Sequence, residues 1–145
     1  MHRSFYMMNS DSQHKRLTFK KKERLKSRST IQALFDTNQN LKNYPFKLVW
    51  MIVPSSGTSM VKAGVSVSKR NHRSAVTRNF IKRRMRECYR TNKLDLYQSI
   101  DGKNIELSFM LIYLSSEIVP FTEFEQKIKQ LLFRLSEKVK TNDFL

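Results

Sequence analysis

The stretch that decides the fold runs from residue 64 to residue 90 and reads GVSVSKRNHRSAVTRNFIKRRMRECYR. From Lys69 to Arg90 it holds nine Lys or Arg residues and a single acid, Glu87. Solvated surface helices usually mix both signs, so this density of positive charge indicates a polyanionic partner. The alternative is a helix that is basic only for solubility. It is the weaker interpretation, because the like charges would repel one another without an anion nearby.

The hydrophobic period changes inside this stretch. From Val61 to Ser68, apolar and polar residues alternate, which is the period of a half-buried strand. After Ser68 the spacing is helical, and Ser74 is a candidate N-cap. Steps of about 100° per residue give two neighbouring arcs. The predicted core arc consists of Ile81, Met85, Cys88 and Tyr89, with Arg78 at its edge, and the predicted polyanion-binding arc consists of Asn79, Lys82, Arg83, Arg86 and Arg90.

Two segments, SVSKR at 66–70 and AVTRNFIKRRMRECYR at 75–90, resemble the signature of the bacterial ribonuclease P protein component. The family motif reads Arg-Asn-Arg, one residue, Lys-Arg, and this chain has RNFIKR at 78–83. It departs from the motif at Phe80, where the family usually has a basic residue. The resemblance extends from about Arg24 to Leu135; outside 61–90 it rests mostly on pattern and on the order of the elements.

The resemblance implies that the catalytic centre belongs to a large RNA, with Mg²⁺ bound mainly by that RNA and the substrate. The protein would bind the catalytic RNA and the 5′ leader of precursor tRNA, promote endonucleolytic removal of the leader, and be inactive alone. The resemblance and the charge pattern together predict RNA contacts at Arg24, Lys26, Ser68, Lys69, Arg70, Arg78, Asn79, Lys82, Arg83, Arg86 and Arg90. A leader groove between the first helix and the sheet would involve Ile31, Phe35, Val49 and Trp50. Trp50 as plain core stays an equal alternative, because it shares a strand face with Leu48 and Ile52.

Composition supports a nucleic-acid partner. The 145 residues carry a net charge of +16, and 18 of the 28 basic residues lie in 1–28 and 69–90. This size predicts one domain, and this charge indicates a nucleic-acid partner ahead of an anionic membrane surface. The resemblance implies that the partners are the catalytic RNA and precursor tRNA, with no DNA and no membrane partner. No apolar run is long enough for a membrane span, and no signal peptide is recognisable, so we expect a cytoplasmic protein.

A nuclease centre made of protein side chains is not indicated. The three histidines, His2, His14 and His72, fall in a predicted tail or loop, and His72 is expected to be solvated there. Paired carboxylates and metal-ligand clusters do not occur at the usual spacings, so we expect no catalytic residue and no metal ligand. Cys88 is the single cysteine and is expected to be a buried thiol.

The remaining pattern predicts an α/β (α+β) two-layer sandwich with a small mixed sheet. We expect a flexible basic tail at 1–22 (its start at Met1, Met7 or Met8 is open), one domain at 23–140 and a tail at 141–145. Within the domain we expect a helix capped by Ser29 or Thr30, a hairpin of strands 46–53 and 60–68, and a connector at 92–103. A strand at 104–114 and a helix from Thr122 complete it. The strand–helix–strand crossover is left-handed in the family.

Three points stay open. Another basic RNA-binding protein of similar fold, such as a ribosomal protein, is the alternative function. A sequence-specific DNA binder is disfavoured, because strands flank the basic helix. Phe80 has either a structural role, packed under the loop 70–74 or the connector after Arg90, or a stacking role on RNA; we favour the structural role slightly.

Overall fold

The computed structural model describes residues 18–55, 57 and 59–141. The 3₁₀ turn Lys21–Glu23 comes first. The helices are α2 (Arg28–Asp36), α3 (Ala75–Asn92), α4 (Leu94–Ile100) and α5 (Phe121–Thr141). The strands are β1 (Asn40–Asn43), β2 (Phe46–Pro54), β3 (Met60–Val67) and β4 (Ile105–Tyr113). The candidate starts Met1, Met7 and Met8 lie outside the described residues.

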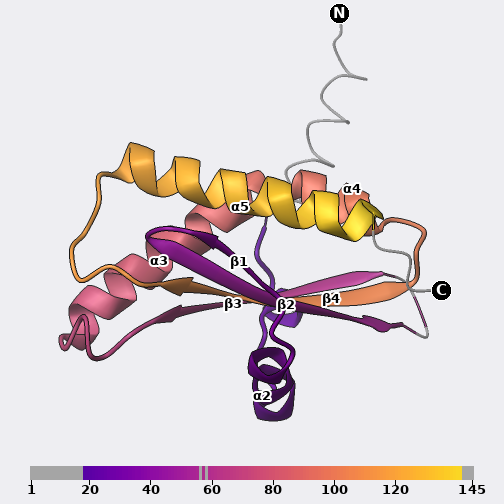
Figure 1. Cartoon of the computed structure of the whole chain (residues 1–145), viewed down its shortest axis with the longest axis horizontal. Helices are drawn as coiled ribbons and strands as arrows, with labels where there is room; N and C mark the ends of the chain where they lie inside the picture. The colour runs from indigo at the N-terminus through magenta and orange to yellow at the C-terminus, as the bar shows by residue number, and fades with distance from the viewer. Residues whose placement is uncertain (1–17, 56, 58, 142–145) are drawn as a thin grey trace, which may run out of the picture.

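The four strands form one mixed sheet in the order β1-β2-β4-β3. β2 is antiparallel to both β1 and β4, whereas β3 is parallel to β4. Helices α3, α4 and α5 cover one face of the sheet, and α2 lies against the other (Figure 1). The predicted α/β sandwich with a mixed sheet is therefore confirmed.

The predicted hairpin of β2 and β3 is wrong, because β4 lies between these strands. Phe109 of β4 pairs with Trp50 on one side and with Ala63 on the other. β2 and β4 are the central strands, and both are apolar along most of their length, as expected for strands covered on both faces. β3, with its clean alternation, is an edge strand.

Three other parts of the chain differ from expectation. The predicted connector at 92–103 contains helix α4, and the residues between α2 and β2 contain the short strand β1. The N-cap of α2 is Ser27, not Ser29 or Thr30: its hydroxyl oxygen accepts a hydrogen bond from the Thr30 amide at 3.3 Å. Of the expected tail 1–22, residues 1–17 lie outside the described part. Phe19 is described, and its ring meets Tyr89 edge-on, with centroids 5.4 Å apart.

The core face of α3 is as predicted. Ile81, Met85, Cys88 and Tyr89 are all buried. Ser74 caps the helix, accepting a hydrogen bond from the Thr77 amide at 3.3 Å. Burial raises the pKa of the Cys88 thiol to about 12, so the thiol stays protonated near neutral pH. None of the helices in the described part of the chain has the length and apolarity that crossing a membrane requires.

Candidate RNA interface

The solvent-facing side of α3 presents a row of basic residues. Asn79 and Arg83 are exposed, and Lys82 and Arg86 are half-buried. Lys82 and Arg86 are one helical turn apart, so their side chains project from neighbouring positions on the same side. This geometry suits the phosphate backbone of a nucleic acid, which recurs at regular spacing.

Arg78, the first residue of the motif, is held by the protein itself. Its Nη1 donates to the carbonyl oxygens of His72, at 2.9 Å, and Arg73, at 2.8 Å. Arg78 therefore ties the loop between β3 and α3 to the helix. His72 is buried, not solvated as expected, because its Nε2 donates to the Ser115 carbonyl at 2.8 Å.

The loop before α3 presents two further cations. The Ser68 hydroxyl oxygen accepts from the Arg70 amide at 3.1 Å, and the Ser68 carbonyl accepts from the His72 amide at 3.0 Å. Ser68 is thus a turn-forming residue, and the turn exposes Lys69 and Arg70.

Arg90, at the end of the row, is engaged by an acid. Its Nη2 lies 2.5 Å from Oε2 of Glu87. This hydrogen bond lowers the pKa of Glu87 and raises that of Arg90, so both groups stay charged. Among the predicted RNA contacts, Arg90 is thus the one whose positive charge is balanced by a neighbouring carboxylate in the described part of the chain.

A groove of about 310 Å³ opens on the α2 face, next to the β3 edge. It lies between α2, the β3–β4 part of the sheet and the segment that precedes α2. Its lining is both basic and apolar: Phe19, Arg24, Leu25, Lys26, Ile31, Ala63, Gly64, Val65, Arg86 and Met110. No carboxylate lines it, so the groove suits an anion better than a metal ion.

Two guanidinium groups meet at this groove. Burial and then the nearby charge of Arg24 lower the pKa of Arg86. The Leu25 amide donates a hydrogen bond to the Ala63 carbonyl at 2.9 Å. The segment that carries Arg24 therefore pairs with the edge of β3 that is not bonded to β4. Like charges held together in this way repel one another, and a bound polyanion would relieve that repulsion.

The predicted groove residues divide between the two faces of the sheet. Ile31 lines the groove, and Val49 lies beneath α2 in the small cluster with Met110. Phe35 is exposed on α2 and is not among the lining residues. Trp50 lies in the main core on the opposite face, so its assignment to the groove is wrong and the core alternative holds.

The sequence did not identify Gly64 and Met110 as lining residues of the groove. Val49, Met110 and Gly64 form one cross-strand row on the α2 face. A Cβ built on Gly64 would lie 3.0 Å from Cε of Met110 and 3.4 Å from Cβ of Leu25. The only sequence signal for this was a glycine on the polar face of an alternating strand.

Metal ligands are not grouped in the described part of the chain: no three His, Cys, Asp or Glu side chains are placed to hold an ion.

A family model, curated relatives and solved structures all relate this chain to the same kind of protein. The family model described as Ribonuclease P matches residues 19–136. The ribonuclease P protein component of Porphyromonas gingivalis is 30% identical over 119 residues, covering 82% of this chain and 87% of the relative. That of Chlorobium phaeobacteroides is 33% identical over 133 residues, covering 83% and 90%. The RNase P protein from Thermotoga maritima superimposes with a TM-score of 0.55 at 25% identity, covering 77% of this chain and 96% of that chain.

Proposed function

From the premise that the chain belongs to the ribonuclease P protein family, we propose that its fold carries two RNA contacts, which adjoin at Arg86. The chain is the protein subunit of a ribonucleoprotein endoribonuclease that acts in tRNA 5′ processing, and its partners are RNAs. In our proposal, α3 and the loop before it bind the catalytic RNA. The groove on the α2 face binds the single-stranded 5′ leader of precursor tRNA. The family match removes support from the ribosomal-protein alternative.

The groove is the observation that carries this proposal. Single-stranded RNA is bound without strict sequence preference where a basic channel follows its backbone and apolar or aromatic surfaces contact its bases. Here Arg24, Lys26 and Arg86 supply the charge. Ile31, Val65 and Met110 supply the apolar surface. Phe19 adds an aromatic ring at the rim, with Cζ of Arg24 5.3 Å from its centroid.

The contacts of α3 suit a folded RNA. Base edges in an RNA helix are hard to reach, so such a helix is recognised mainly through its phosphates and its shape. Lys82 and Arg83 provide phosphate contacts on a rigid helix, and Asn79 provides a neutral donor. Arg86 belongs to the same helix but also lines the groove, so the two contacts meet at this residue. Lys69 and Arg70 extend the row at the N-terminal end of α3, while Ser68 shapes the turn that presents them.

The proposed role of the protein in catalysis is electrostatic. Precursor tRNA and the catalytic RNA are both polyanions and repel each other. The cations of the groove and of α3 reduce this repulsion. We propose that Mg²⁺ is held mainly by the RNA subunit and the substrate. We also propose a cytoplasmic location, with neither DNA nor a membrane as partner.

The proposal is tested by reconstituting the protein with its catalytic RNA. We expect no cleavage of precursor tRNA by the protein and Mg²⁺ alone. In the holoenzyme, Arg24→Ala should weaken binding of a precursor with a leader of several nucleotides more than binding of mature tRNA. Because only the precursor has a leader, equal losses for both would contradict a leader groove.

A further inference from the structure

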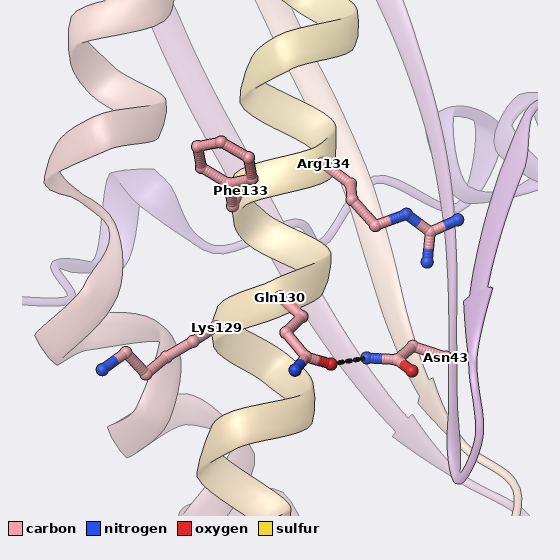
Figure 2. Close-up of a pocket in the computed structure, with 5 residues that line it drawn as sticks. All are labelled: Asn43, Lys129, Gln130, Phe133 and Arg134. Carbon is pink, nitrogen blue, oxygen red and sulfur yellow. Dashed lines mark hydrogen bonds between the residues drawn. The ribbon is translucent and has the colours of Figure 1, made fainter.

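A second hollow lies on the other side of the molecule, where α5 passes β1. Its volume is about 390 Å³, within the size range of small-ligand sites. Figure 2 shows its lining residues, which are Asn43, Lys129, Gln130, Phe133 and Arg134. The buried face of α5 packs in the main core, and the exposed face beside this hollow takes no part in that packing.

The wall of the hollow is fixed by hydrogen bonds between β1 and α5. Asn43 Nδ2 donates to Oε1 of Gln130 at 2.8 Å and to the Lys127 carbonyl at 3.1 Å. Arg134 Nη1 donates to the Lys42 carbonyl at 2.8 Å. The amides of Asn43 and Gln130 and the guanidinium of Arg134 are therefore held in defined positions at the sheet edge.

The chemistry of the lining is an exposed aromatic ring next to positive charge. Phe133 is 56% exposed. The neighbouring large apolar residues of α5 are all buried, namely Leu131, Leu132 and Leu135. Lys129 and Phe133 project from one side of the helix, and Gln130 and Arg134 project toward β1 (Figure 2). The lining contains two cations and no carboxylate. Its charge is thus complementary to a phosphate-bearing partner.

We propose that this hollow binds a nucleotide of the catalytic RNA. An unstacked base packs on the face of Phe133, Lys129 and Arg134 bind the flanking phosphates, and the amide of Gln130 meets the base or ribose edge. Aromatic stacking with basic flanks is the common means of holding single-stranded nucleotides. The inference rests on the proposed function, which supplies the RNA.

The position of the hollow selects the catalytic RNA over the leader. The leader groove lies on the α2 face near β3, whereas the hollow lies beside α5, against β1 at the opposite sheet edge. A leader in the groove would have to pass around the sheet to reach it. Helices α3 and α5 lie in the same layer, on one side of the sheet (Figure 1). An RNA that binds α3 and is large enough to span this layer therefore reaches the hollow beside α5.

Substitutions in the hollow test the contact through affinity and its salt dependence. Phe133→Ala should weaken binding to the catalytic RNA about 5- to 150-fold, the range for losing one stacked base, with an unchanged slope of log affinity against log salt. Lys129→Ala should lower that slope by roughly 0.7–0.9. Lys138→Ala removes an exposed cation of α5 that does not line the hollow and should have the smaller effect. Equal affinity and slope for all three variants and the wild type would overturn the proposal.

Photocrosslinking identifies the partner directly. A benzophenone side chain at position 133 should form an adduct with the catalytic RNA in the holoenzyme without substrate. The same group in place of Gln98, exposed on α4, is the control. No more adduct than at position 98, or an adduct that forms only after precursor tRNA is added and only with that tRNA, would overturn the proposal. Lys82→Ala reports separately on α3, so failure of the hollow and failure of the α3 interface are distinguishable.

Discussion

Nζ of Lys93 lies 2.5 Å from Oε1 of Glu23, and the Lys93 side chain is only 1% exposed. Lys93 also donates to the Thr18 carbonyl, and the Tyr97 hydroxyl donates to Glu23. The ion pair joins the start of α4 to the turn that precedes Arg24. The basic segment at the groove is therefore held to the domain by a buried charge pair, as well as by the pairing of Leu25 with Ala63.

Glu23→Gln should destabilise the protein by about 3 kcal/mol, because it leaves the Lys93 ammonium buried without a counter-charge. Urea unfolding measures this loss. Replacing both partners, as Glu23→Gln with Lys93→Met, removes the uncompensated charge and should recover part of it. A double variant less stable than Glu23→Gln alone would show that Lys93 is held by its other contacts and not by the carboxylate.

The same pair should make stability depend on pH in acid. Burial alone would raise the pKa of Glu23, but hydrogen bonds from Lys93 and Tyr97 outweigh it and lower this pKa below the ordinary 4.5. A lowered pKa in the folded state gives stability that is present above pH 4.5 and is lost as the pH falls through the folded-state pKa.

We therefore expect the unfolding free energy of the wild type to fall below about pH 4.5, and that of Glu23→Gln to fall less. Glu87 titrates in the same direction with Arg90, but it is exposed and contributes little. Glu87→Gln is thus the matched control. Parallel pH profiles for the wild type and Glu23→Gln would be inconsistent with this assignment.

The residues of the α3 motif should separate by role. Lys82→Ala should lower the salt slope of binding to the catalytic RNA by roughly 0.7–0.9 and leave the melting temperature almost unchanged. Arg78→Ala should lower the melting temperature, because it removes the two hydrogen bonds that hold the loop before α3. Equal melting temperatures for the two variants would mean that the loop does not depend on Arg78.

Local periodicity explains which parts of this fold could be predicted. The buried arc of α3 from Ile81 to Tyr89 depends only on helical spacing, and it was predicted correctly. Strand pairing is not local. The apolar run at 46–53 indicates a strand covered on both faces, but nothing in it identifies Phe109 as the partner of Trp50. A short turn followed by an alternating strand favours a hairpin. In the structure, β4 instead lies between β2 and β3.

The site shows the same limit. Alternation placed Val49 and Trp50 on opposite faces correctly, but it does not say which face lies under α2. Lys93, in a polar stretch after a basic helix, was taken as part of a connector, and its burial depends on Glu23, 70 positions earlier. The groove and the α5 hollow also need non-local pairs, Leu25 with Ala63 and Asn43 with Gln130.

Gly64 offers a test of the groove that leaves every charge in place. A valine side chain there would press on Met110 and Leu25 and narrow the floor. We expect Gly64→Val to weaken binding of precursor tRNA to the holoenzyme more than binding of mature tRNA. Gly57→Ala is the control, because a Cβ there meets nothing within 4 Å. Full precursor affinity in Gly64→Val would place the leader elsewhere.

Phe80, where the chain departs from the family motif, has a partner within the protein. Cζ of Arg84 lies 4.6 Å from the Phe80 ring centroid and 5.1 Å from that of Phe121. Arg84 thus links α3 to the start of α5, a different place from the loop 70–74 or the connector considered from the sequence. This supports a structural role, since a cation–π contact at an exposed site contributes about 0.5–1 kcal/mol. Phe80→Arg would replace that contact with repulsion between like charges one turn apart.

We expect Phe80→Arg to lower the melting temperature, with little change in RNA affinity once the protein is folded. Phe121→Leu should have a smaller effect in the same direction, because it removes the second ring but adds no charge. An intact melting temperature, together with a changed affinity and a steeper salt dependence for Phe80→Arg, would instead show that the Phe80 ring contacts the catalytic RNA. A structural role predicts a change in thermal unfolding and little change in binding, whereas a stacking role predicts the reverse. Measuring the melting temperature and the salt dependence of binding for Phe80→Arg therefore distinguishes the two roles.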